Sequence, residues 1–189
     1  MKTDTKQSAR ARLLAAADEL FYADGVQSVG IDRVIEHAGV AKASLYNTFG
    51  SKENLVQAYL EGRHQATMDL LRRAIDRQSD PRQRLLAVFD AQAELFVDPG
   101  FRGCAFTTAS AEAPDGGLIQ QATEQYRVDV RDLLTDLARA AGASEPAALG
   151  RQLQFIYDGA GLAAQMDRDP DSAAAAKAAA TVLLDAATR

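Results

Sequence analysis

The stretch 38-AGVAKASLYNTFGSKENL-55 decides the fold of this 189-residue chain. Gly39 and Gly50 each follow a short apolar pattern, and Ser51 is suited to cap the helix that comes next. Leu45 and Phe49 are four residues apart and so share one helical face. The stretch therefore predicts a tight turn, a short helix that ends at Gly50, and the beginning of another helix.

Two more helices are expected before this stretch. Apolar residues recur at helical spacing from Leu13 to Phe21 and stop at Asp24-Gly25, and a shorter set runs from Ile31 to Ala38. Two short helices joined by a glycine-containing turn and packed on a longer helix present the second short helix to a DNA major groove. Plain core packing is the alternative, because amphipathic helix pairs are common.

The solvent face of the second short helix favours DNA binding. Its side chains are small or form hydrogen bonds, and none is acidic; they are Lys42, Ala43, Ser44, Asn47 and Thr48. Lysine can donate to guanine, asparagine can pair with adenine, and a threonine methyl can contact thymine. We expect the base-reading residues to come from this set.

The spacing of Ala38-Gly39-Val40, Leu45-Tyr46, Phe49 and Ser51-Lys52-Glu53 resembles the DNA-binding signature of the TetR family of transcriptional regulators. The resemblance implies an all-α protein with a DNA-binding domain at 1–50 and a linker, ligand-binding and dimerisation domain at 51–189. It also implies that Tyr46 and Lys52 contact phosphates; the alternatives are that Tyr46 covers the edge of the core and that Lys52 is a solvated charge. Because the family pattern is incomplete at two positions, we expect Arg33 to contact the DNA backbone as well. Phosphate contacts supply affinity and register, not sequence choice.

Two positions depart from the family pattern. Gly30 opens the second helix where the family usually has threonine, and Ala41 opens the third where Ser or Thr is usual. A lost side-chain cap costs about 0.5–2 kcal/mol against alanine and little against glycine. We therefore expect the fold to survive and the list of DNA contacts to differ.

The remainder of the chain also reads as helical. A helix from Ser51 to about Asp76 has no internal proline, and Asp80-Pro81, Ser144-Glu145-Pro146 and Asp169-Pro170 each look like a helix start. Alternating patterns typical of strands are absent from the sequence. About nine helices are expected in all.

Apolar stripes near the C-terminus are candidates for a dimer interface. They comprise Leu149, Leu153, Ile156, Ala160 and Ala164, followed by Ala176, Ala180, Leu183 and Ala187. The family resemblance implies that the last two helices pair with those of a second copy, which would set two recognition helices about 34–36 Å apart on a pseudo-palindromic operator. Core packing within one copy is the alternative.

The same resemblance implies an inducer pocket among the middle helices. The candidate residues are His64, Met68, Phe101, Cys104, Phe106, Tyr126, Phe155 and Tyr157. Aromatic residues and methionines at helical spacing are also typical of an ordinary core. Cys104 is either a redox switch or a small apolar filler, and His64 either senses a ligand or lies on a helix surface.

The charge is uneven along the chain. The whole chain carries a net charge of −5, with +1 on residues 1–77 and −6 on residues 78–189. Lys2, Lys6, Arg10 and Arg12 form a basic N-terminal arm against one acidic residue, Asp4. The acidic balance therefore does not exclude a nucleic-acid partner, because it belongs to the C-terminal part.

Composition excludes several kinds of site. One cysteine and two histidines leave no disulfide within the chain and no structural zinc site, and we expect no metal or cofactor. No apolar run reaches the roughly 20 residues that span a bilayer, and no secretory signal is visible, so a cytoplasmic protein with no membrane partner is expected.

These observations lead to one functional expectation and two alternatives. We expect a homodimeric, ligand-responsive regulator, most simply a repressor that a small-molecule inducer releases from double-stranded operator DNA. A helical interaction protein that has lost DNA binding is the first alternative. An all-helical enzyme is the second, but the sequence offers no G-x-S-x-G elbow, phosphate-binding glycine loop or acid/base pair at catalytic spacing.

Overall fold

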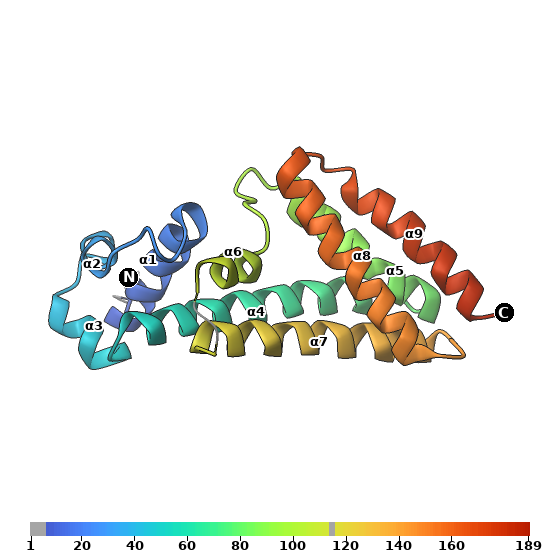
Figure 1. The fold of residues 1–189 in the computed structure, drawn as a ribbon, viewed down its shortest axis with the longest axis horizontal. Coiled ribbons are helices and arrows are strands. Elements are labelled where there is room, and N and C mark those ends of the chain that lie inside the picture. Colours follow the sequence, from blue (N-terminus) through green and yellow to red (C-terminus); the bar gives the residue numbers. More distant parts are fainter. Residues whose placement is uncertain (1–6, 114–115) are drawn as a thin grey trace, which may run out of the picture. The chain divides into compact units, whose positions relative to one another are not determined.

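The computed structural model describes residues 7–113 and 116–189. These residues form nine α-helices and no strand, which confirms the expected all-α fold class (Figure 1). In chain order the helices are α1 (Ala9–Asp24), α2 (Ile31–Ala38), α3 (Lys42–Phe49), α4 (Lys52–Asp76), α5 (Pro81–Phe96), α6 (Ala105–Glu112), α7 (Leu118–Ala140), α8 (Pro146–Asp167) and α9 (Ser172–Ala187). Lys2 and Lys6 of the expected basic arm lie outside the described residues.

The first three helices pack on one another around an apolar core. Leu13 of α1, Val34 of α2 and Leu45 of α3 are each fully buried there. The Ser8 hydroxyl accepts a hydrogen bond from the N–H of Ala11 at 3.2 Å and so caps α1. This packing confirms the helix–turn–helix arrangement that the spacing predicts.

The turn between α2 and α3 depends on a glycine and on a distant arginine. Gly39 has φ +59°, in the left-handed region that side chains rarely adopt, and it ends α2. The Arg12 guanidinium of α1 donates a hydrogen bond to the carbonyl of Gly39. Arg12, expected in the basic N-terminal arm, thus holds the turn that precedes the recognition helix.

Of the three helix starts expected next to a proline, α5 has a side-chain cap, whereas α8 and α9 have none. α5 begins after Asp80, whose carboxylate accepts from the N–H of Gln83 at 2.9 Å, and α8 begins at Pro146. α9 begins at Ser172, later than the Asp169-Pro170 pair predicts. The Asp169 carboxylate accepts from the backbone N–H two residues later, at 3.0 Å, so it closes a turn instead of capping the helix.

The chain divides into two compact units whose boundaries differ from the expected 1–50 and 51–189. The first comprises the described residues of Met1–Arg63 and Ala105–Thr123, and the second comprises His64–Cys104 and Glu124–Arg189. The beginning of α4 and all of α6 therefore group with the helix–turn–helix. We refer to these parts as the first unit and the second unit.

The second unit is a bundle in which α8 packs against α9 and both contact α5. Leu85, Phe89, Leu134, Leu153 and Leu184 are completely buried in it. α7 approaches α8 closely at Gly150, where an added Cβ would lie 2.3 Å from Thr135 Oγ1 and 2.9 Å from its Cα. The absence of a side chain at this position allows that contact.

The described helices differ from membrane-spanning helices. None of them combines the length and the apolar character that crossing a lipid bilayer requires. The same residues contain no group of three or more His, Cys, Asp or Glu side chains arranged to hold a metal ion.

Candidate nucleic-acid interface and ligand site

Helix α3 presents a mixed polar face to solvent. Lys42, Ala43, Tyr46, Asn47 and Thr48 are exposed and Ser44 is half-buried, whereas Leu45 and Phe49 are buried. Five of the six side chains expected on the DNA-facing side are thus accessible. α3 begins after Ala41 without a side-chain cap, as α2 does after Gly30, and the Ala41 carbonyl accepts from the N–H of Ser44 at 2.9 Å.

Two of these side chains already have partners inside the first unit. Lys42 Nζ donates to Asp32 Oδ1 at 2.8 Å, and this hydrogen bond to a carboxylate raises the pKa of Lys42. The Thr48 hydroxyl donates to the Ser44 carbonyl at 2.6 Å, one turn earlier in the same helix. Asn47 is exposed, and unlike Lys42 and Thr48 it has no internal hydrogen bond among those that the described residues form on this face.

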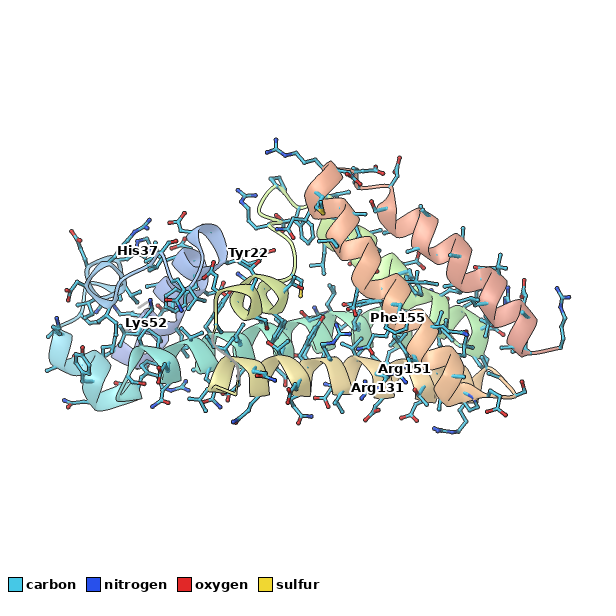
Figure 2. All side chains as sticks on the ribbon, viewed as in Figure 1. Tyr22, His37, Lys52, Arg131, Arg151 and Phe155 are labelled. Carbon is cyan, nitrogen blue, oxygen red and sulfur yellow. The ribbon has the colours of Figure 1, made fainter. Side chains whose placement is uncertain are left out.

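The side chains expected at phosphates lie at the ends of these helices. Tyr46 is 47% exposed. Lys52, labelled in Figure 2, opens α4, where Ser51 Oγ accepts from the N–H of Asn54 at 3.2 Å. Partial burial lowers the pKa of Lys52, and the nearby Glu112 carboxylate opposes that shift. The amide groups at this helix start favour an anion.

Two arginines near the interface have internal contacts. Arg33 pairs with Asp24 at 2.7 Å, and both side chains are about half exposed. The Arg10 guanidinium lies 5.7 Å from the ring centroid of Phe49. Arg33 would have to exchange its carboxylate for a phosphate in order to contact DNA, which an exposed ion pair permits at low cost.

Helix α6 is attached to the turn after α1, a contact that sequence reasoning missed. Glu112 Oε2 accepts from the N–H of Gln27 at 2.8 Å, and the Glu112 carbonyl accepts from Gln27 Nε2 at 3.2 Å. The two residues are 85 positions apart. No local sequence pattern could have paired them.

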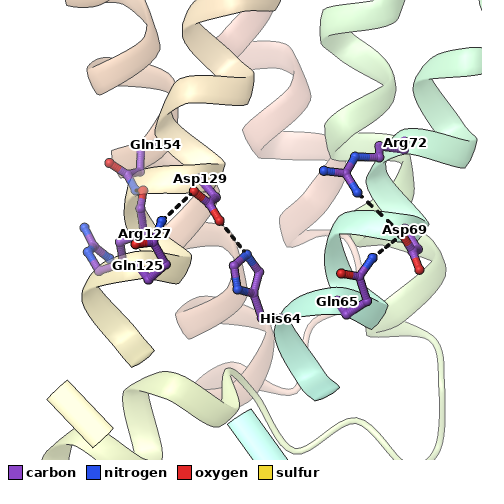
Figure 3. A network of polar contacts seen from close by, with 8 residues as sticks. All are labelled: His64, Gln65, Asp69, Arg72, Gln125, Arg127, Asp129 and Gln154. Atoms are coloured by element: carbon purple, nitrogen blue, oxygen red, sulfur yellow. Dashed lines mark hydrogen bonds and ion pairs between the residues drawn. The ribbon is translucent and has the colours of Figure 1, made fainter. Parts of the chain in front are cut away.

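Four of the ligand-site candidates come together in the second unit. Tyr126 and Tyr157 are buried, with their hydroxyl oxygens 3.4 Å apart. The His64 ring meets Tyr126 edge-on at 5.5 Å between centroids, and His64 Nε2 lies 3.1 Å from Asp129 Oδ2 (Figure 3). Cys104 is half-buried and close enough to influence both tyrosines. α4, α7 and α8 thus each contribute to one buried polar cluster.

Burial dominates the electrostatics of this cluster. It raises the pKa of Tyr157 to about 12 and that of Tyr126 well above its usual value, and neighbouring groups add to the shift of Tyr126. Burial also raises the pKa of Asp158, although the hydrogen bond from Arg127 at 2.7 Å opposes the change. Both tyrosines therefore remain neutral hydrogen-bonding groups near pH 7.

The other candidates lie elsewhere. Met68 is buried in the second unit, and Phe101 packs on Phe96 at 5.1 Å between centroids. Phe106 is buried in α6, which belongs to the first unit. Phe155 is 62% exposed (Figure 2), because it lies on the outer face of α8, opposite the buried Tyr157. The expectation that Phe155 lines a buried pocket is therefore not supported.

One buried polar residue near this cluster was not anticipated. Gln92 of α5 is buried, and its Nε2 donates to the carbonyl of Tyr157 at 2.9 Å. A single glutamine in an apolar helical pattern, flanked by Ala91 and Ala93, was the available signal.

Most residues of the stripes expected at a dimer interface are covered by their own chain. Six of their nine residues are buried within one copy and belong to its core, namely Leu149, Leu153, Ala160, Ala164, Ala176 and Ala180. Ile156, Leu183 and Ala187 are half-buried. The six buried side chains have little surface left to offer a second copy.

A different apolar face of α8 and α9 is open to solvent. Phe155, Leu162 and Met166 are 62%, 49% and 72% exposed, and their spacing places them on one face of α8. Val182 of α9 is 68% exposed. Gly159 lies on the same face of α8, and nothing in its own chain would meet an added Cβ there. We refer to these residues of α8 and α9 as the outer apolar face.

Comparison with known proteins identifies several similar chains. Residues 13–59 match the family model described as "Bacterial regulatory proteins, tetR family". The HTH-type transcriptional activator FasR of Mycolicibacterium smegmatis is 36% identical over 128 residues, which is 67% of this chain and 58% of that protein. The HTH-type transcriptional regulator TtgR of Pseudomonas putida is 38% identical over 49% of this chain and 45% of its own. This chain thus aligns with about half the length of each of these two relatives.

Solved structures extend the similarity to nearly the whole chain. SCO4454, a TetR-family transcriptional regulator from Streptomyces coelicolor, is 33% identical, with a TM-score of 0.90 and 96% of each chain covered. The reduced form of Escherichia coli NemR shares the fold at a TM-score of 0.79 and 24% identity, covering 93% of this chain and 97% of its own. The whole length of the chain is therefore compatible with one known architecture.

Proposed function

The chain belongs to the TetR family of bacterial transcriptional regulators, and from this premise we propose that it binds a double-stranded operator as a homodimer and is released by a small-molecule inducer. The observation that carries the proposal is the exposed, acid-free face of α3, built on buried Leu45 and Phe49. The proposed site of action is the cytoplasm, where an operator is accessible.

On DNA, Asn47 and Ser44 would read base edges, with Ala43 and the Thr48 methyl as apolar contacts. Lys42 would join them once it leaves Asp32, its partner at 2.8 Å. Tyr46 and Lys52 would bind phosphates on either side, and Arg33 would add a third phosphate contact. In this arrangement the flanking phosphate contacts fix the position of the protein on the DNA, and the residues at the centre of α3 select the base sequence.

The phosphate role of Lys52 is tested by the salt dependence of DNA binding. Lys52→Ala should weaken binding to duplexes of any sequence and reduce the slope of log K against log salt by about one. Lys177→Ala is the matched control, because Lys177 lies in the second unit and pairs with Asp90 at 2.6 Å. An unchanged slope for Lys52→Ala would remove its phosphate contact from the proposal.

The outer apolar face is the proposed dimer interface. Exposed Phe155, Leu162, Met166 and Val182 would be buried by the same residues of a second copy, and Gly159 would let two α8 helices approach closely. Dimerisation is also what a two-fold operator requires. Two helices from each copy would form a four-helix contact.

Leu162→Glu tests this surface, because it places a charge at the centre of the proposed interface. Light scattering should show a monomer, and affinity for a two-fold operator should fall because only one half-site is engaged at a time. Val97→Glu is the matched control, since Val97 is 67% exposed and lies outside α8 and α9. A Leu162→Glu protein that remains fully dimeric would place the interface elsewhere.

The inducer would bind at the buried tyrosine cluster of the second unit. A ligand that binds more tightly to the conformation that cannot bind the operator shifts the population toward that conformation. The difference in binding free energy between the two conformations has to reach a few kcal/mol for an effective switch. The relatives include an activator, FasR, and a repressor, NemR, and we favour repression for this chain. Transcription from the promoter next to its gene, measured with and without the chain, decides the sign.

A further inference from the structure

Gln92 contains an acceptor that the protein leaves unused. Its Oε1 is the one buried side-chain nitrogen or oxygen in the described residues without a hydrogen-bond partner. The side chain is 3% exposed, so bulk water does not solvate the oxygen. A buried acceptor without a donor destabilises a protein, and each instance calls for an explanation.

The orientation of the amide is fixed by its other end. The group facing Gln92 at 2.9 Å is the backbone carbonyl of Tyr157, which can only accept. The amide nitrogen must therefore lie on that side, and the oxygen points away from it. If the nitrogen and oxygen of the Gln92 amide were exchanged, its oxygen would face the Tyr157 carbonyl and neither could donate. The contact with Tyr157 therefore determines which way the amide points.

The second buried glutamine of the second unit provides a contrast. Gln154 is 2% exposed, and its Nε2 donates to the carbonyl of Arg127 at 2.7 Å. Both glutamines thus attach their nitrogen to a helix backbone, but Gln92 alone has an unpartnered buried oxygen. A side-chain link between two helices therefore does not by itself explain why the oxygen of Gln92 lacks a donor.

Two charge pairs lie close to Tyr157 and Tyr126. Arg127 binds Asp158 at 2.7 Å, and His64 lies 3.1 Å from Asp129 (Figure 3). A charged ligand that entered this region would lose its hydration and would have to compete with these pairs for their charged partners. The two tyrosines offer neutral hydroxyls in the same unit.

We propose that Gln92 Oε1 is a specificity-determining acceptor for an uncharged ligand that presents an O–H or N–H donor, bound between α5 and α8 beside the Tyr126–Tyr157 pair. The inference rests on the proposed function, because it names the class of molecule that acts as inducer. A site with a buried acceptor rejects analogues that lack the matching donor.

Pairs of probes that differ only in the donor test this inference. The probes are 4-propylphenol with its methyl ether 4-propylanisole, and acetanilide with N-methylacetanilide, titrated into the full chain by calorimetry. At least one donor should bind about tenfold or more tightly than its methylated counterpart. The difference should vanish in Gln92→Met, which keeps the volume, and persist in the matched control Gln154→Met.

Equal affinity within both pairs, or a donor preference that survives Gln92→Met, would overturn the inference. A crystal structure grown with the tighter donor supplies a second readout, which is needed if Gln92→Met does not fold. The donor atom should lie at hydrogen-bonding distance from Gln92 Oε1, and a water molecule there in place of the probe would overturn the inference.

These outcomes are separable from the proposed function because none of the measurements contains DNA. A donor that binds through Gln92 without changing operator affinity would leave the acceptor site in place and remove the inducer role. A protein that binds its operator but shows no preference for the donor probes would leave the proposed DNA binding in place and overturn the role of Gln92.

Discussion

Lys42 Nζ and Asp32 Oδ1 form an exposed ion pair, 2.8 Å apart, between the first turn of α3 and the first turn of α2. A carboxylate at this position occupies the lysine and would also face the DNA backbone. We therefore predict that the Asp32 carboxylate weakens DNA binding, because it repels phosphates and competes with them for Lys42.

Asp32→Asn should strengthen binding to duplex DNA a few-fold at low salt. The change removes a negative charge and releases Lys42, whereas Lys42→Ala should weaken binding. Fluorescence anisotropy with a labelled duplex measures both effects. Asp136→Asn, an exposed carboxylate paired with Arg139 in the second unit, serves as the control, and equal affinity of the Asp32→Asn and wild-type proteins would contradict this prediction.

The buried tyrosines should make the protein sensitive to alkaline pH. An unfolded tyrosine ionises near pH 10, whereas burial holds the pKa of Tyr157 at about 12, so the folded state retains its proton over this range. The contribution of Tyr157 to stability should therefore be constant below pH 10 and fall by about 2–3 kcal/mol as the pH rises to 12.

Denaturant unfolding across this pH range measures the loss, and absorbance at 295 nm reports the ionisation. Tyr157→Phe should reduce the pH dependence, with buried Tyr126 accounting for what remains, and Tyr46→Phe, at an exposed position, should leave it as in the wild type. Ionisation of all five tyrosines near pH 10 in the folded protein would disagree with the buried pair.

Two glycines of α8 should respond in opposite directions to alanine. At Gly150 a Cβ would lie 2.9 Å from the Thr135 backbone, and Gly150→Ala should cost about 1–3 kcal/mol of stability. At Gly161 nothing lies within 4 Å, and Gly161→Ala should stabilise the helix by about 0.5–1 kcal/mol. Urea unfolding of the two variants measures these changes in stability. Equal changes in the free energy of unfolding for Gly150→Ala and Gly161→Ala would contradict the close α7–α8 contact.

The helices of the first unit could be predicted from sequence because local signals determine them. Ser8, Gly25 and Gly39 end or begin helices through their own backbone and side-chain chemistry, and apolar spacing sets the buried face. Asp169 shows the limit of such signals, because its carboxylate closes a turn where a cap was expected.

The parts of the site that could not be predicted depend on contacts between distant residues. The pairing of Glu112 with Gln27 and that of Arg12 with Gly39 leave no periodic signal in the sequence. Helix α8 has apolar residues on two faces. The spacing of these residues therefore does not distinguish Leu153, which faces the core of its own chain, from Leu162, which faces solvent. The empty acceptor of Gln92 likewise depends on which carbonyl the helix packing brings to its amide.

Selection of duplexes from a random pool by the full chain tests the central claim, that α3 of each copy reads one half of a symmetric operator. The account predicts a pseudo-palindrome with half-sites about one helical turn apart, centre to centre. Asn47→Ala should enrich a looser sequence at equivalent positions. A wild-type pool that stays random, or that enriches a sequence without two-fold symmetry, would contradict the account.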